Sequence, residues 1–234
     1  GALAEAFDGS EGVSFTDRTI RAISITGAGG IAGVSVAVAS INIYSNAIAY
    51  LEGDVNEAAN LTVSAVSDYP LNLAATLTAS GGVAAVGASV ALVNVGGNTE
   101  ASIVGDAQVD VAGTVKLTNN LTTNAVTGAA AIGGGAVSVN GAVSLAVNRT
   151  RMDTFIGQGV RLTAGRLEML ANASTSAKTY IIGVSAGGTA IGVNAAVAIL
   201  APTVLTYIGA TPEGFDAAQG AASSNLGKVT VNND

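Results

Sequence analysis

The chain has 234 residues, 49% of them hydrophobic and 4% aromatic, and it carries 9 basic against 16 acidic residues, for a formal charge of −7. It contains no Cys, His or Trp, which excludes disulfides, thiolate chemistry, a Ser-His-Asp triad and a His-based zinc site. Its acidic balance disfavours nucleic acid and anionic membranes as partners, because both carry negative charge.

The elements expected in chain order are strands. The first is a short alternation at Val13-Ser14-Phe15, which is similar to the strand that closes each later repeat. A Gly/Ala-rich apolar run follows at 27–43, in which Val34, Val36 and Val38 alternate with small residues. This two-residue period predicts a strand, and since neither face is charged we expect both faces to be buried. Long helices are not expected, because each glycine would weaken a helix by about 1 kcal/mol relative to alanine.

The same landmarks recur at a constant interval, as they do in repeat proteins. Structural repeat glycines stand 52 residues apart, each at the end of a similar five-residue phrase, at Gly53, Gly105, Gly157 and Gly209. The apolar run recurs at 79–95, 131–147 and 185–200. Short apolar alternations follow the glycines, at Leu61-Thr62-Val63, Val115-Lys116-Leu117, Leu167-Glu168-Met169 and Val229-Thr230-Val231. We interpret 211–225 as an exposed loop whose insertion delays the last copy by about ten residues.

A 52-residue unit without a helix cannot bury its apolar face alone, whereas stacked copies share a dry interior of small aliphatic groups. We therefore predict an all-β fold, a β-solenoid (parallel β-helix-like) built from about four 52-residue repeats. It forms a single repetitive β domain over 1–234, with approximate copies at 16–68, 69–120, 121–172 and 173–234 and a partial copy at 1–15. Around Asp110-Val111 and Thr114-Val115-Lys116-Leu117 the alternation is clean, so one face there should meet the core and the other water. Neither end shows a clear cap, so we expect a piece of a longer array or a subunit that stacks end to end.

The stretch 81–117 carries a recognisable phrase. It pairs a Gly/Ala/Val run with the residues Asn98, Thr99, Ala101, Ile103, Gly105 and Asp106, followed by alternating valines. The third copy keeps Asn148, Thr150, Ile156 and Gly157, and the fourth keeps Ile208 and Gly209. Over about 26–231 the chain resembles the repeat region of giant type V secreted exoproteins, namely filamentous-haemagglutinin-like and leukotoxin-like filamentous adhesins and autotransporter passengers.

The resemblance implies a right-handed β-helical shaft at the bacterial cell surface or in the extracellular medium, with an adhesive or fibre-building role and no catalytic residues. Its partners would be adjacent repeats or identical subunits end to end, together with a host or cell-surface receptor or glycan. We expect neither nucleic acid binding nor membrane insertion.

Three patterns could carry chemistry, and each has a simpler interpretation. The segment Gly27-Ala28-Gly29-Gly30 is similar to a nucleotide-binding loop, but no helix follows it and the pattern recurs, which indicates a bend. Asp106 with Asp110, or Glu52 with Asp54, could form a glycosidase pair or bind calcium, but acidic residues are scattered singly, as in solvated turns. Acceptor patterns for N-glycosylation occur at Asn60, Asn120, Asn148 and Asn172. We predict no catalytic, cofactor-binding or metal-binding residue.

The leading functional hypothesis is thus a non-catalytic structural or adhesive shaft segment of a bacterial surface fibre or adhesin. A self-assembling extracellular filament subunit is the close alternative, and a β-helix enzyme acting on polysaccharide through Asp or Glu is the second. A third class treats the four apolar runs as transmembrane helices of about 20 residues. Their content of Gly, Ser and Asn and their two-residue alternation favour strands instead.

Overall fold

The computed structural model describes residues 3–5, 19–209 and 229–231. In these residues the chain forms strands and no helix, and all strands belong to one continuous hydrogen-bonded system of ten strands. Apart from β1, every strand pairs in parallel with the equivalent stretch of a neighbouring pass of the chain. The expectation of an all-β, solenoid-like fold is therefore confirmed.

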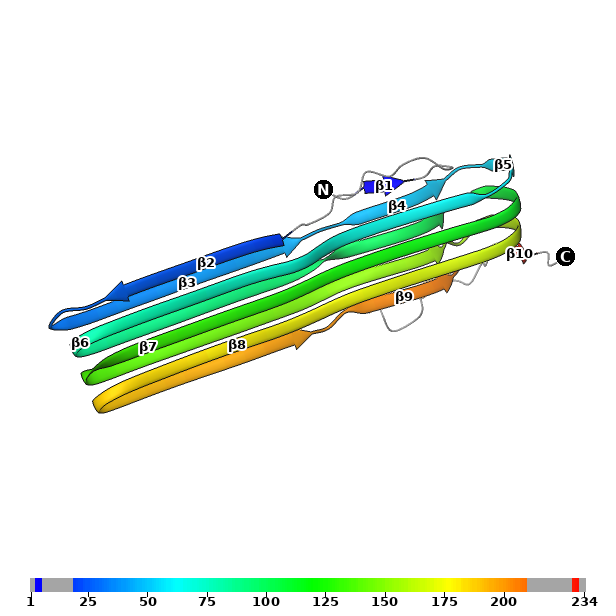
Figure 1. Cartoon of the computed structure of the whole chain (residues 1–234). Coiled ribbons are helices and arrows are strands. Elements are labelled where there is room, and N and C mark those ends of the chain that lie inside the picture. Colours follow the sequence, from blue (N-terminus) through cyan, green and yellow to red (C-terminus); the bar gives the residue numbers. More distant parts are fainter. Residues whose placement is uncertain (1–2, 6–18, 210–228, 232–234) are drawn as a thin grey trace.

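The strands are long because the backbone hardly leaves its pairing partner. They are β1 (Leu3–Glu5), β2 (Thr19–Ala28), β3 (Ala32–Tyr44), β4 (Ala47–Glu52), β5 (Val55–Ala58), β6 (Leu61–Val104), β7 (Gln108–Ile156), β8 (Arg161–Leu200), β9 (Thr203–Ile208) and β10 (Val229–Val231). Strands β6, β7 and β8 each run along the molecule, bend sharply and return, as do β2 and β3 (Figure 1).

We call the stretches before the bend the outgoing limbs and those after it the return limbs. The glycine-rich bends form the tip of the molecule, and the opposite turns at 53–60, 105–113 and 157–165 form its base (Figure 1). The tip half comprises residues 22–43, 74–95, 127–148 and 179–200, which are equivalent to one another in the strand register. The remainder of the described chain is the base half.

Equivalent residues lie on top of one another in successive passes, but the step between passes varies. The first pass pairs with the second at a step of 52, as Val34 lies beside Val86. The second pairs with the third at 54 up to Tyr69 and at 53 from Asn72 onward, and the third pairs with the fourth at 52 from Thr114 onward. The changes from 54 to 53 and from 53 to 52 fall at irregularities in the pairing, where one strand has an extra residue, whereas the change from 52 to 54 falls in the base turn between Glu52 and Leu61.

In the base half the two limbs enclose an aliphatic core. Its buried members include Val63, Ile103, Val111, Val115, Leu117, Ile156 and Leu162. Asp110 is exposed and Lys116 is half-buried, while the valines and leucine that alternate with them are buried. The clean alternation predicted for this stretch is therefore confirmed, with one face on the core and the other toward water.

In the tip half the interior next to the bends consists of small and polar side chains, whereas Ile41, Ile43, Val93 and Val95 form a buried aliphatic cluster where the tip half meets the base half. The fully or nearly buried residues include Ser35, Thr76, Thr78, Ser80, Ser89, Thr127, Ser138, Asn140 and Ser144, together with alanines. Hydroxyls of the two limbs meet directly, at 2.6 Å from Ser89 Oγ to Thr76 Oγ1 and at 2.7 Å from Ser144 Oγ to Thr127 Oγ1. The dry, purely aliphatic interior expected from the sequence is therefore wrong for this half of the molecule.

The valines of the first apolar run point outward. The prediction that both faces of this strand are buried is wrong, because Val34, Val36 and Val38 are 64%, 56% and 57% exposed. The residues between them, Ser35 and Ala37, face the opposite limb and are buried. Next to the bends the limbs are close enough for hydroxyls to hydrogen-bond and leave no room for branched side chains, so the bulky face lies on the outside there. Nearer the base half the inner positions of the same strands hold branched residues such as Ile41 and Val93.

The two ends of the solenoid differ from the sequence-based expectation. Strand β1 pairs antiparallel with β6, Leu3 lying beside Val66, while the closing strand expected at 13–15 lies outside the described residues. Strand β10 pairs with β8 so that Val229 lies beside Leu162. It is therefore equivalent to 109–111. The predicted equivalence with the alternation at 115–117 is wrong, because the insertion between β9 and β10 is longer than the ten residues or so that we expect from the sequence. The expected loop at 211–225 also lies outside the described residues.

Candidate functional site

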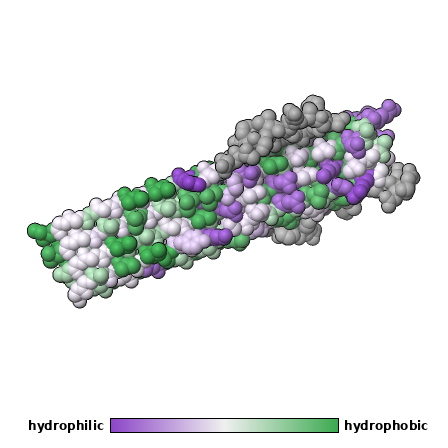
Figure 2. All heavy atoms as spheres, in the orientation of Figure 1, coloured by the Kyte–Doolittle hydropathy of each residue, from purple (hydrophilic) through white to green (hydrophobic). Residues whose placement is uncertain are grey.

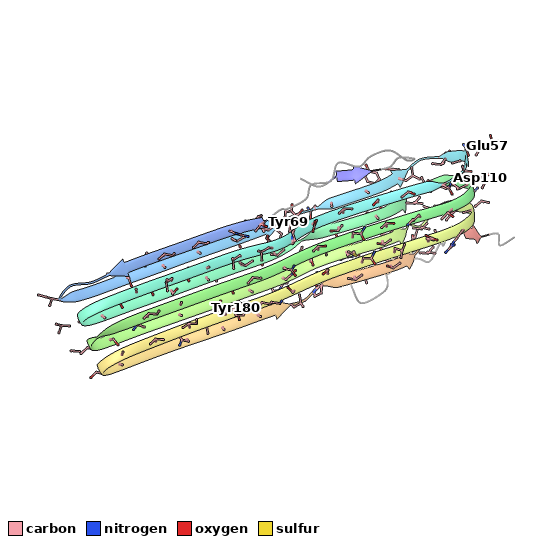
Figure 3. The ribbon with its side chains drawn as sticks, viewed as in Figure 1. Glu57, Tyr69, Asp110 and Tyr180 are labelled. Carbon is pink, nitrogen blue, oxygen red and sulfur yellow. The ribbon has the colours of Figure 1, made fainter. Side chains whose placement is uncertain are left out.

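The acidic residues considered as paired carboxylates lie in the turns of the base, where Figure 3 shows Asp110 close to Glu57. Glu52, Asp106 and Asp110 are exposed, and Asp54 Oδ1 accepts a hydrogen bond from the backbone N–H of Gln108 in the next pass (2.9 Å). Two asparagines make the same contact between passes, Asn46 with the Asn98 N–H (3.0 Å) and Asn60 with the Thr114 N–H (2.9 Å). Within the described ranges, no three Asp or Glu residues come together as metal ligands. These polar side chains therefore act as braces between stacked turns.

The four repeat glycines do not occupy one structural column. Gly53, Gly105 and Gly209 have φ values of 118°, 72° and 93°, in the region that favours glycine. The 53-residue step between the second and third passes instead brings Gly157 beside Val104, and its N–H donates to the Ile103 carbonyl (2.7 Å). In that turn Gly159 adopts the positive φ, at 85°.

The remaining sequence motifs have structural roles in the fold. Gly30, in the glycine-rich segment compared with nucleotide loops, forms the tip bend and leads into β3, so the required helix is absent there. Asn148, one of the glycosylation patterns, is fully buried, and its Nδ2 donates to the Thr123 carbonyl (3.1 Å) and to the Ser176 carbonyl (3.2 Å). A side chain so engaged is inaccessible to a glycan.

A narrow gap lies between the limbs where the tip half meets the base half. Ile43, Val95, Leu121, Thr123 and Thr150 contribute to its lining, and it is too narrow to hold a water-sized molecule. Pockets that bind small molecules usually measure about 300–1,000 Å³ and combine apolar walls with convergent polar groups. This gap is a packing space between the two limbs and does not have the dimensions of a ligand site.

The outer surface of the tip half is apolar and uncharged. No Asp, Glu, Lys or Arg occurs at 22–43, 74–95, 127–148 or 179–200. On the return limbs, the exposed residues form what we call the valine face: Val34, Val36, Val38, Val86, Val137, Val139, Val143, Ile191, Val193 and Val197. On the outgoing limbs, the outgoing face contains Ile23, Ile25, Ile132, Tyr180, Ile182 and Val184. Figure 2 shows hydrophobic residues gathered toward the tip and hydrophilic residues toward the base.

This surface went unrecognised in the sequence, although part of its signal was there. The recurrence of charge-free stretches at the repeat interval is visible in the letters. The same stretches fit a fully buried strand equally well, since charge is absent from both faces in either case. Which of the two faces is exposed is decided by the opposite limb.

The second feature capable of recognition is the pair of open sheet edges. Among the described residues, β2 and β3 pair on one side only, with β6, and the tip-half part of β8 pairs on one side only, with β7. The other side of each strand presents backbone N–H and C=O groups without a strand partner in the described chain. Edge strands that avoid association usually carry charges or proline, and the tip-half edges contain neither.

No protein-family model matches the chain, and no curated protein or solved structure matches it either. Within the described ranges, no helix has the length and apolar character needed to cross a membrane.

Proposed function

We propose that the chain is a non-catalytic structural module of a bacterial extracellular surface fibre or adhesin, in which its passes stack on equivalent passes above and below. One observation carries the proposal. The passes pair in parallel with equivalent residues in register, and in the tip half the outermost strands of the described stack are open, uncharged copies of the strands already paired inside it.

The columns of equivalent residues explain why such an edge can accept another pass. Val34, Val86, Val139 and Ile191 lie side by side in four successive passes, all pointing outward. A further pass with the same pattern would extend this column and complete the unpaired backbone hydrogen bonds of β8. In such a linear stack the stability is the sum of the interfaces between neighbours, so added passes stabilise those already present.

The dimensions give the proposed fibre an unusual cross-section. The return limb of β6, residues 84–104, spans about 70 Å at the rise of an extended strand. Four passes rise only about 19 Å along the stacking direction, at the usual spacing between paired strands. A fibre built this way is a flat tape whose width exceeds the height contributed by one module, and its turns at the base carry the charged residues available to a receptor or glycan.

A self-assembling filament is the second candidate, because the same open edges would accept an identical copy. The two candidates differ in where the next pass comes from. Long uniform tapes formed by the isolated chain would favour the filament, and short particles that join only reversibly at high concentration would favour a segment of a longer fibre.

The test is an edge-blocking variant. Ala196 lies on the inner side of β8 and is exposed at the open edge, so Ala196→Lys leaves the isolated chain folded but would force a charge between the sheets if another pass stacked there. Ser174→Lys on the outer side of the same strand is the matched control, because its side chain stays in water on stacking. Sedimentation velocity should show concentration-dependent association into species larger than a dimer, which is lost with Ala196→Lys and kept with Ser174→Lys. A chain that forms no species larger than a dimer, or that forms them equally with both changes, would show that the edges are not stacking surfaces.

A further inference from the structure

We propose that the valine face is a second, lateral contact surface, which docks face to face onto the valine face of another copy with the two molecules antiparallel. The contact is perpendicular to the stacking direction and does not depend on end-to-end association, so it goes beyond the proposed function.

The first observation is the inverted sidedness of the tip half. Hydroxyl-bearing side chains such as Ser89, Ser144 and Thr127 are buried between the limbs, whereas Val38 and Val143 stand 57% and 44% exposed on the outside. A protein surface usually keeps its largest contiguous apolar patch to a few hundred Å², and larger patches mark interaction sites. β-Branched residues at every second position also form the even surface that packs well against another sheet.

The size of the valine face suits a specific contact between two proteins. In each of four neighbouring passes, the face extends along about twelve residues of the return limb, every second of which points outward, starting with 32–43 in the first pass. At the usual strand rise and spacing, this corresponds to about 750 Å² per copy and about 1,500 Å² in total. Stable specific interfaces bury about 1,200–2,000 Å² in total, so a single face-to-face contact meets the requirement.

The charge distribution selects the antiparallel arrangement. Every described Asp, Glu, Lys and Arg lies in the base half, where the described acidic residues outnumber the basic ones by ten to seven. Parallel docking would bring two like-charged bases together, whereas antiparallel docking overlaps the uncharged tip halves and places the bases at opposite ends. The repulsion between the bases is then minimised without any specific ion pair.

The open edges favour a protein partner over a lipid bilayer. Hydrocarbon could cover the valine face, the outgoing face and the tip at once. It would also surround the unpaired backbone groups along β2, β3 and β8, and each such group costs several kcal/mol when removed from water without a partner. A second copy on the valine face covers the valines and leaves those edges in water.

The experiment uses the full chain carrying Ala196→Lys, so that end-to-end stacking is suppressed and the lateral contact is measured alone. Val38→Glu with Val143→Glu places two carboxylates on the valine face, in the first and third passes. Ile25→Glu with Ile132→Glu places two on the outgoing face of the same passes and is the matched control. All four side chains are exposed in the isolated chain, and circular dichroism verifies that the strand content is unchanged.

We expect the Ala196→Lys chain to form dimers in sedimentation velocity, the valine-face variant to associate at least tenfold more weakly, and the outgoing-face variant to associate unchanged. The chain has no Cys, so Val36→Cys supplies a unique thiol midway along the outermost strand of the valine face, which should cross-link two copies under mild oxidation when the first passes of the two copies face each other. Asp110→Cys at the base should not. The proposal would be overturned if the Ala196→Lys chain stayed strictly monomeric, or if both glutamate variants weakened dimer formation equally. It would also be overturned if the chain floated with phosphatidylcholine vesicles and both variants abolished this flotation, which would indicate that the surface binds lipid.

Discussion

A single added methyl group inside the tip half should disrupt a hydrogen-bonded ladder that links three passes. Asn140 lies between the limbs and is almost completely buried. Its Oδ1 accepts a hydrogen bond from Ser80 Oγ (3.2 Å) in the second pass, and its Nδ2 donates to Ser185 Oγ (2.9 Å) in the fourth. Gly133 faces it from the opposite limb, and a Cβ there would lie 2.2 Å from Asn140 Nδ2 and 2.5 Å from Oδ1.

The neighbouring passes show how the interior avoids this clash. Beside Gly133 stand Ser80 and Ser185, and beside Asn140 stand Gly87 and Gly192. In each of these passes a larger side chain on one limb therefore faces a glycine on the other. The larger side chain is on the return limb in the third pass and on the outgoing limb in the second and fourth passes. Gly133→Ala breaks the match and must displace the Asn140 amide, because the backbone of both limbs is paired on both sides.

The magnitude follows from the groups that lose their partners. Displacing the amide removes two hydrogen bonds of about 1 kcal/mol each and leaves buried polar atoms unsatisfied, so Gly133→Ala should destabilise the fold by about 3 kcal/mol. Asn140→Gly in the same chain restores the space, so adding Gly133→Ala to Asn140→Gly should change stability by no more than about 0.5 kcal/mol. Gly128→Ala is the control, because it lies on the same strand with nothing within 4 Å of the added Cβ.

Equilibrium urea unfolding, followed by circular dichroism and tyrosine fluorescence, measures the stability of the four variants and the wild type. A shift of the midpoint without a change of slope would report stability alone. If Gly133→Ala matched the wild type, or if it cost as much in the Asn140→Gly background as without it, the clash would not be the cause and the account of the tip interior would be refuted.

Two further pairs of substitutions compare the interior with the outer surface. Leu117→Ala should lower the free energy of unfolding by about 2–5 kcal/mol, because the side chain is fully buried in the aliphatic core of the base half. Val66→Ala, on the outer side of the adjacent pass, should lower it by about 1 kcal/mol or less. Urea unfolding of the two variants checks the difference. Ala142→Leu should lower stability by about 1–3 kcal/mol, because the larger side chain overfills the space between the limbs. The neighbouring Val143→Thr, on the outer face, should change stability by about 0.5 kcal/mol. If a thermal scan found Val143→Thr to be the more destabilising change, the valines would have to form the core.

Of the two features of the candidate site, the open edges could be predicted from the sequence and the valine face could not. The parallel stacking that creates the open edges was foreseeable, because equivalent apolar runs recur near a constant interval and can satisfy their backbone groups only on one another. The valine face was not, since the alternation of Val34, Val36 and Val38 with small residues defines two faces without saying which lies inside. The constant spacing of Gly105 and Gly157 was also misleading, because the pairing step between their passes is 53.

The sequence by itself determined the strand content, the parallel stacking and the sidedness of the base half, where charged residues such as Asp110 mark the outer face against Val111 and Leu117. Only the tertiary structure decided the sidedness of the tip half. There the inner face is chosen by the distance between two limbs, and that distance depends on small side chains such as Thr76 and Ser89, which are neighbours in space but belong to different limbs. Next to the bends, hydroxyl contacts and matched glycines hold the limbs so close that branched residues such as Val34 and Val38 are left outside, where they form the surface available to a partner.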